Sequence, residues 1–506
     1  YREIMREFGT MEDFDRLLKE IHKREMRLVL DLVVNHTSDE HPWFEEARKS
    51  RHNPYYNYYH WWPAEKGEPP LRLSYFDEEG NAWMYNKPTD SYYLHYFSRK
   101  QPDLNWENPE IRQEIFDMMR FWFDKGIDGF RMDSISLIAK DPSFPLIDSK
   151  KYPDIFSFYA KEPRLHLYLH EMNRQVLSKY DCMSVGEGSA VMVDDVAKFV
   201  DPAREELNML YHFDAARIRN TTLPDNPESG IDYSLIALKK MFTEWDKAID
   251  KGWPSIYLGN HDQPRMVSRF GSDKDEFRAL SAKMLITFLL TMRGTPYWFA
   301  GDEIGMRNIR FDRIEDYNDI DTINRYKKAK AEGKDPQAVL DEQKETGRDN
   351  ARTPFQWDRS PEAGFTAGTP WLKVNPDYTW INVADEEKDP TSILNYFKKV
   401  VSFRKENPSL IYGSYHLLDA ENPQCYIFLR KTGADTYLIM LNFSPKAAIS
   451  TPGIDMSNAH VLLDNYGDRS HMAPQKDITL RPFEAIVFQL NHPVYESFID
   501  SLDLLE

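Results

Sequence analysis

The 506-residue chain has only two cysteines, Cys182 and Cys425. Two cysteines cannot build a disulfide framework, and neither lies in a cysteine motif with metal-binding spacing. This cysteine usage is compatible with a reducing compartment, so we expect a cytoplasmic protein. The chain opens at Tyr1 with no methionine and no signal-like segment, which decides little because a leader can precede it.

An excess of positive charge and long apolar runs are also missing. Lys and Arg number 64 against 82 Asp and Glu, which gives a formal net charge of −18. Nonspecific nucleic-acid binding needs clustered basic residues, so we expect no nucleic-acid partner. The best apolar run, residues 285–292, is far too short to cross a bilayer, so we expect no membrane partner. An acidic surface suits a neutral substrate.

Over the first 300 residues, helix signals alternate with apolar strand signals. An amphipathic run at 11–25 precedes an apolar run at 27–34, and four clear repetitions place further strands near 127–133, 182–187, 255–262 and 297–302. A sixth, shorter strand is expected at 207–213. This rhythm is typical of a parallel α/β fold, and we expect a (β/α)8 TIM barrel. Six strands rather than eight imply that, in a barrel, two βα units are missing.

Two regions interrupt the rhythm. Residues 37–100 are long, polar and aromatic, which predicts an inserted subdomain B after a barrel strand. From 411 to 506 the pattern changes to strand alternation punctuated by Pro and Gly, which predicts a C-terminal antiparallel β-sandwich. The catalytic barrel is then expected to comprise 1–36 and 101–410.

Acidic residues end several of the predicted strands. Arg131 and Asp133 are two residues apart on one strand and so share a face, while Glu187 and Asp262 end two others. Taken alone, Arg131 and Asp133 are better explained by a structural ion pair at the barrel rim. Likewise, His36 taken alone is better explained as a hydrogen-bonded structural residue.

Convergence of the whole set favours chemistry over structure. Strand ends of a barrel meet on one face, and glycoside hydrolysis needs two carboxyl groups there, one ionised and one protonated. Like charges packed together raise one pKa, as an acid catalyst requires.

Four ordered blocks carry a family resemblance: Asp31-Leu-Val-Val-Asn-His36, Gly129-Phe-Arg-Met-Asp133, Val185-Gly-Glu187 and Asn260-His-Asp262. They resemble glycoside hydrolase family 13, the α-amylase family. Residues 101–106 and 348–357 resemble its oligo-1,6-glucosidase branch. That branch also holds α-1,4-glucosidases, dextran glucosidases, trehalose-6-phosphate hydrolases and sucrose isomerases.

The resemblance implies a retaining, exo-acting α-glucosidase working on short α-linked oligosaccharides by double displacement. Asp133 is then the nucleophile, Glu187 the general acid/base and Asp262 the transition-state stabiliser. The implied substrate-binding residues are His36, Arg131, His261, Arg348, Arg352, Phe97 and Phe76. For both Phe residues, packing of the insertion is an equally good explanation.

The resemblance also implies which other molecules the chain needs. No cofactor is expected for the chemistry, and no metal ligand is assigned. A structural calcium ion is compatible with the family, but its loop, together with roughly 60–70 residues of two βα units, would precede Tyr1. The expected partner is a small oligosaccharide, and the expected oligomeric state is a monomer.

Two local departures from the family pattern put strict α-1,6 specificity in doubt. Ser134 follows the nucleophile where Val accompanies α-1,6 preference, and Gly188-Ser189 replaces the bulkier Met-Pro of α-1,6 enzymes. The region 213–220 matches the Arg-rich loop of sucrose isomerases poorly, which favours hydrolysis over isomerisation. The alternatives are therefore a sucrose isomerase or transglucosylase with the same triad, or a catalytically silent member resembling transporter ancillary subunits.

Overall fold

The computed structural model describes residues 1–76, 80–152, 154–433, 435–454, 456, 459–469 and 476–490. The chain forms two compact units, Tyr1–Phe213 with Ala248–Trp253, and Asp214–Lys247 with Pro254–Glu506. Each unit is described by itself. Within the described residues, no helix is both long enough and apolar enough to span a membrane.

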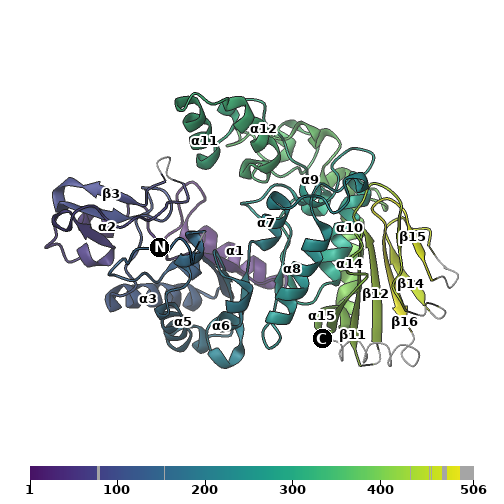
Figure 1. The fold of residues 1–506 in the computed structure, drawn as a ribbon, viewed down its shortest axis with the longest axis horizontal. Helices are drawn as coiled ribbons and strands as arrows, with labels where there is room; N and C mark the ends of the chain where they lie inside the picture. The colour runs from purple at the N-terminus through teal and green to yellow at the C-terminus, as the bar shows by residue number, and fades with distance from the viewer. Residues whose placement is uncertain are drawn as a thin grey trace. The chain divides into compact units, whose positions relative to one another are not determined.

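The first unit, drawn mostly in purple and blue in Figure 1, is built on a four-stranded parallel sheet. The strands follow the order β1 (Val29–Val33), β5 (Gly129–Asp133), β6 (Met183–Glu187) and β7 (Met209–Tyr211). The register pairs Asp31 with Arg131, and Glu187 with Tyr211. The carboxyl ends of these strands therefore carry the polar residues to one edge of the sheet.

Helices alternate with these strands as the sequence predicts. They are α1 (Met11–Lys23), α2 (Pro42–Ala47), α3 (Pro109–Lys125), α4 (Phe156–Tyr159), α5 (Arg164–Gln175) and α6 (Ala197–Val200). Helix α1 begins at a capping box in which Thr10 and Asp13 bond each other's backbone N–H groups, which satisfies donors left unpaired at a helix start. Helix α3 begins at Asn108 and a first-turn proline and ends at left-handed Gly126.

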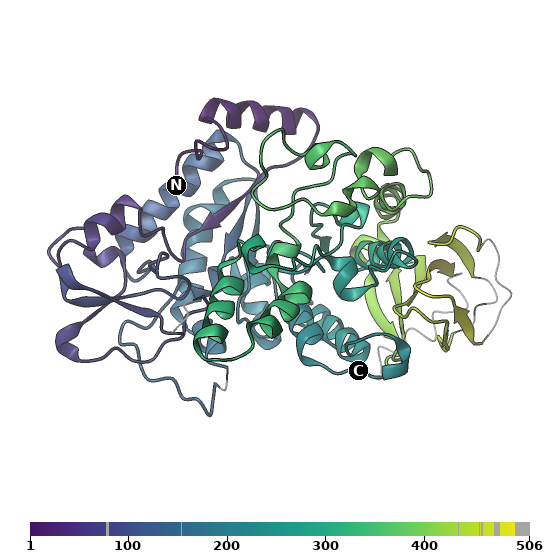
Figure 2. The same cartoon turned by 90° about the horizontal axis from the view of Figure 1, so that it is seen from above.

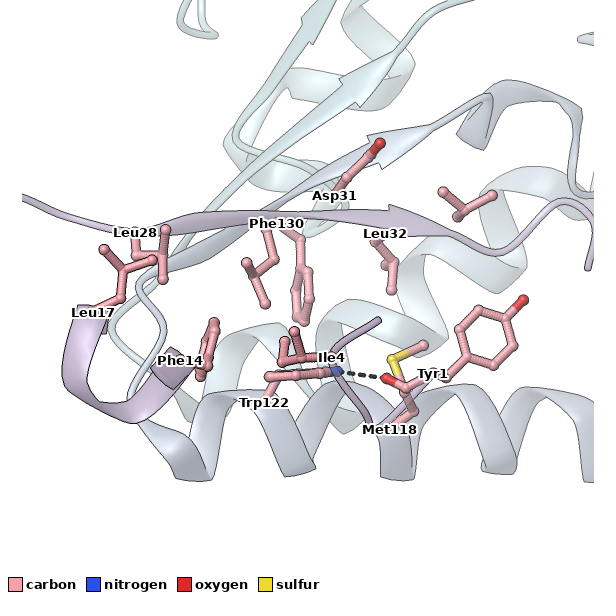
Figure 3. Close-up of a pocket in the computed structure, with 12 residues that line it drawn as sticks. Tyr1, Ile4, Phe14, Leu17, Leu28, Asp31, Leu32, Met118, Trp122 and Phe130 are labelled. Atoms are coloured by element: carbon pink, nitrogen blue, oxygen red, sulfur yellow. Dashed lines mark hydrogen bonds between the residues drawn. The ribbon is translucent and has the colours of Figure 1, made fainter. Parts of the chain in front are cut away.

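Strand β1 lies at the edge of the sheet and borders an apolar groove of about 310 Å³. Leu28, just before β1, and Leu32 of β1 point toward α3, as does Phe130 of β5 (Figure 3). On α3, Trp122 donates a hydrogen bond to the Tyr1 carbonyl at 2.8 Å. Asp31 points to the opposite side of the strand. One side of β1 thus carries apolar side chains that line the groove, and the other carries Asp31.

The segment 37–100 contains a separate three-stranded antiparallel sheet. Its order is β2 (Trp61–Pro63), β4 (Ser91–Leu94) and β3 (Trp83–Asn86). Aromatic rings fill its core; Tyr96, for example, stacks on Tyr159 with centroids 3.9 Å apart. The aromatic run of this insertion is therefore in large part packing material.

The second unit combines helices with antiparallel strands (Figure 2). Its helices are α7 (Asp214–Thr221), α8 (Leu235–Ala248), α9 (Met266–Phe270), α10 (Arg278–Thr291), α11 (Ile320–Ala331), α12 (Pro336–Thr346), α13 (Val383–Glu386), α14 (Ile393–Glu406) and α15 (Ser409–Tyr412). The strand expected at 255–262 is much shorter, β8 (Ser255–Ile256), and it pairs in parallel with β9 (Thr295–Pro296). The prediction of a strand at 297–302 is wrong, because the strand there is β9, which ends just before that range. Within the described residues the strands do not close into a barrel.

The C-terminal region is antiparallel, as the sequence predicts. Its main sheet has the order β10 (Ser414–Leu418), β11 (Cys425–Thr432), β12 (Asp435–Asn442), β16 (Ala485–Leu490) and β14 (His460–Asp464). A second pair, β13 (Ala448–Ser450) and β15 (Ile478–Leu480), shares one hydrophobic core with it. On the other face, Phe288 of α10 packs on Tyr426 of β11 at 5.2 Å. The end of the expected region, 491–506, lies outside the described residues.

Candidate active site

The first unit gathers three carboxyl groups around one guanidinium, that of Arg131 in β5. Its terminal nitrogens donate to Asp133 Oδ1 at 2.7 Å, Glu187 Oε2 at 2.8 Å and Asp31 Oδ1 at 2.8 Å. Gly129 allows β5 to lie close to β6, because a Cβ at this position would lie 2.2 Å from the Met183 carbonyl oxygen of β6. We call Asp31, Arg131, Asp133, Glu187 and Tyr211 the strand-end cluster.

Charge holds Arg131 in place. Burial disfavours the charged guanidinium, but Glu187, Tyr211, Asp31 and Asp133 outweigh burial and raise the pKa of Arg131. Arg131 therefore stays cationic and balances carboxylates that would otherwise repel one another.

Tyr211 and Ser134 complete the cluster. Tyr211, at the end of β7, accepts a hydrogen bond from Arg131 Nε at 3.0 Å; a polar residue closing a short strand was the only signal for it in the sequence. The backbone N–H of Ser134 donates to Glu187 Oε2 at 2.9 Å. Ser134 reaches that position in a left-handed conformation with φ +44° and ψ +33°, which is unusual for a residue with a side chain.

His36 lies beside this cluster and is almost fully buried. Its Nε2 faces the Gln101 side-chain amide nitrogen at 3.0 Å, and its Nδ1 faces that of Asn35 at 3.3 Å. Burial, reinforced by the charge of Lys140, lowers the pKa of His36 against the opposing effects of Asp103 and Asp133. The imidazole is therefore neutral near pH 7.

The two predicted aromatic residues are neighbours of His36. The ring of Phe97 lies 5.1 Å from that of His36 and 5.7 Å from that of Phe76. Phe97 also stacks on Tyr75 with centroids 5.1 Å apart and an interplanar angle of 17°. Both Phe side chains are half-buried, so packing and sugar contact remain compatible for them.

The second unit brings together the other four predicted residues. Asp262 Oδ1 accepts from Arg352 at 2.9 Å and from Arg348 at 3.2 Å. Asp262 Oδ2 lies 3.2 Å from His261 Nε2. Asp319, which the sequence did not single out, accepts from Arg348 Nε at 2.9 Å. We call His261, Asp262, Asp319, Arg348 and Arg352 the loop cluster.

The second cluster is balanced in charge. Burial opposes the charge of Arg348, but Asp319 and Asp262 prevail and raise its pKa. Within the described residues, no three or more His, Cys, Asp or Glu side chains are arranged to hold a metal ion. The two guanidiniums of Arg348 and Arg352 are therefore matched by the two carboxylates of Asp262 and Asp319.

Comparisons with known proteins identify the family of the chain. Residues 1–413 match the family model described as alpha amylase, catalytic domain. An oligo-1,6-glucosidase of Parageobacillus thermoglucosidasius is 49% identical over 504 residues, which is 97% of this chain and 88% of that protein. One from Bacillus cereus is 46% identical over 500 residues, again with 97% and 88% covered.

A solved structure is similar over the same extent. The trehalulose synthase MutB from Pseudomonas mesoacidophila MX-45 superposes with a TM-score of 0.90 and 40% sequence identity, covering 97% of this chain and 88% of that one. The family match spans most of the chain, including every residue of the strand-end and loop clusters. The chain therefore belongs to the α-amylase family of glycoside hydrolases, glycoside hydrolase family 13.

Proposed function

We propose that the protein is a retaining, exo-acting α-glucosidase that removes terminal α-linked glucose from short oligosaccharides. The observation that carries this proposal is the placement of Asp133 and Glu187 on the two terminal nitrogens of one guanidinium. Two carboxyl groups held that close fit a retaining mechanism, which needs a separation of about 5–5.5 Å rather than the wider gap of inverting enzymes. The relatives named oligo-1,6-glucosidase support the substrate class.

In the first step, Asp133 attacks the anomeric carbon while the glycosidic C–O bond breaks. Glu187 gives its proton to the leaving oxygen, and a β-glucosyl ester of Asp133 forms. We assign the proton to Glu187 Oε1, next to Ser189 Oγ at 3.4 Å. Oε2 is excluded because it accepts from Ser134 N–H and Arg131, so an O–H there would face two donors.

In the second step, Glu187 acts as base. It takes a proton from water, the water oxygen attacks the anomeric carbon, and the bond to Asp133 breaks, which releases α-glucose with retention. Asp262 stabilises the oxocarbenium-like transition state on the same glucosyl group. His36, His261, Arg348 and Arg352 bind its hydroxyls, and Phe97 and Phe76 wall it by stacking.

Sucrose isomerisation is the second candidate, favoured by the similarity to trehalulose synthase structures. Both reactions share the glucosyl-enzyme and differ in whether water or fructose attacks it. A catalytically silent ancillary role is less well supported, because all three candidate catalytic acids are present in the chain. The products formed from sucrose therefore distinguish hydrolysis from isomerisation.

The test compares the full-length protein on isomaltose, maltose, sucrose, trehalose and trehalose-6-phosphate. Hydrolysis with α-glucose as the first anomer seen by NMR, lost in Asp133→Asn, supports the proposal. Isomaltulose or trehalulose formed from sucrose identifies an isomerase instead. Release of β-glucose first contradicts retention, and inactivity of the full-length protein on all five sugars favours the silent alternative.

We also propose that the fold is a (β/α)8 barrel. The parallel order β1-β5-β6-β7 and the parallel pair β8–β9 support this arrangement. The division into barrel, subdomain B and C-terminal sandwich stays a prediction. So do a monomeric state, a cytoplasmic location, chemistry without a cofactor, and a structural calcium ion.

A further inference from the structure

A buried lysine in the first unit is left unexplained by the catalytic cycle. Lys140 lies in the segment after β5, and its side chain is 1% exposed. Its ammonium lies 3.0 Å from Asp103 Oδ2, a carboxyl group that is fully buried. It also donates to Asn35 Oδ1 at 2.6 Å and lies over the ring of Tyr96 at 5.1 Å.

This ammonium joins three segments that are distant in sequence. Asn35 follows β1, Asp103 follows the insertion 37–100, and Lys140 follows the strand that carries Asp133. Backbone contacts reinforce the junction: Leu104 N–H donates to the Asn35 carbonyl at 2.9 Å, and His36 and Asp103 form an isolated β-bridge. A change in the position of Lys140 would therefore also change the position of His36.

The ammonium also fixes which way the Asn35 amide points. Because Oδ1 accepts from Lys140, Nδ2 must face Asp103 Oδ1 at 3.4 Å and His36 Nδ1 at 3.3 Å. Gln101 is fixed in the same sense, since its Oε1 accepts from Ser98 N–H at 3.1 Å and its Nε2 faces His36 Nε2. Both ring nitrogens of His36 thus face amide N–H groups.

An imidazolium could not bond to this environment. An imidazolium carries N–H on both ring nitrogens and would meet a donor at each. A neutral imidazole accepts a hydrogen bond at one ring nitrogen and meets a donor only at the other. We propose that Lys140 is a positioning residue, whose ammonium orients the Asn35 amide and so keeps His36 neutral and fixed beside Asp133. The claim about proton state stands on the geometry alone; its consequence for catalysis rests on the proposed function, in which His36 binds the sugar.

The charges around His36 act in both directions. Asp103 and Asp133 favour its protonation, and Lys140 opposes it together with burial. Loss of the Lys140 ammonium removes one opposing charge, leaves Asp103 unbalanced and frees the Asn35 amide to turn its oxygen toward Nδ1–H. All three consequences raise the pKa of His36.

The experiment is an NMR titration of the His36 imidazole in wild type and in Lys140→Met, with the resonance assigned by its loss in His36→Asn. We expect the titration of His36 to move upward in Lys140→Met by about one unit, the size typical of a changed neighbouring charge. Lys239→Met is the matched control, since Lys239 is equally buried but donates to backbone carbonyls in the second unit. It should leave His36 unchanged. An unchanged His36 titration in folded Lys140→Met overturns the proposal.

Loss of folding in Lys140→Met is covered by a second variant. Asn35→Ala keeps the Lys140–Asp103 pair but removes the donor that faces Nδ1, so it must also raise the pKa of His36; no shift there overturns the proposal. In steady-state kinetics, KM should rise as pH falls in Lys140→Met but not in Lys239→Met. Because the titration needs no substrate, its outcome is independent of whether the proposed hydrolase activity is found.

Discussion

The strand-end cluster and the loop cluster solve different electrostatic problems. In the first, the single guanidinium of Arg131 serves Asp31, Asp133 and Glu187. In the second, Arg348 and Arg352 share Asp262 and Asp319. An excess of carboxyl groups suits a transition state that gains positive charge, while a balanced set suits binding of neutral hydroxyls. Chemistry should therefore be sensitive to the first cluster, and binding to the residues of the second cluster other than Asp262, which we assign to the transition state.

The largest effect is expected from Asp133→Asn, which removes the nucleophile but keeps the side-chain shape. We expect kcat to fall by about 10⁴-fold or more, as for other covalent catalysts. The matched control is Asp31→Asn, because Asp31 bonds the same Arg131 nitrogen at nearly the same distance yet is half-exposed. It should cost about tenfold. Equal losses in the two variants would show that Arg131 pairing, not nucleophilic attack, is what Asp133 supplies.

Next in size is the contrast between the arginines of the two clusters. Arg131→Met leaves three carboxyl groups without a cation, so kcat should fall by about 10³-fold. Arg352→Met leaves Asp262 with Arg348, so we expect an increase in KM of about tenfold with little change in kcat. Steady-state kinetics on isomaltose measures both. A larger kcat loss in Arg352→Met than in Arg131→Met would reverse the division of labour.

Regular strands explain why the position of the strand-end cluster could be predicted from the sequence. The apolar runs before Asp133 and Glu187 set the register of β5 and β6, and register alone places both residues at one edge. No pattern of that kind shows that Lys140 is buried against Asp103, because a lysine in a loop is ordinarily exposed. The strand expected at 255–262 has two residues, Ser255 and Ile256. The loop cluster could be predicted only from its motifs.

A smaller effect concerns linkage preference at Ser134. Its contact with Glu187 uses the backbone N–H, so Ser134→Val keeps that donor and adds apolar bulk next to the leaving group. Because a β-branched residue tolerates the left-handed conformation poorly, we also expect this variant to be less stable. We expect the kcat/KM ratio of isomaltose to maltose to rise about tenfold, the usual reach of one small apolar group. Ser134→Gly is the control, because glycine tolerates the left-handed conformation; its ratio should stay near that of wild type.

The smallest effect extends the comparison to the buried lysines of the two units. Lys140 has a carboxylate partner, whereas Lys239 in α8 donates to the carbonyl oxygens of Asp419, Asn422 and Cys425. Burial lowers the pKa of Lys239 from 10.5 to about 8, despite the nearby charge of Asp419. Between these two values the unfolded chain holds a proton that the folded protein has released, so folding becomes more favourable as pH rises.

The free energy of unfolding of wild type relative to Lys239→Met should therefore increase between pH 8 and 10.5. The slope can reach about 1.4 kcal/mol per pH unit for one proton. Denaturant melts at pH 7, 9 and 10 measure it, with Lys240→Met as control, because Lys240 is the exposed neighbour on the same helix. A flat difference for Lys239→Met would mean that the three carbonyls hold the ammonium charged across this range.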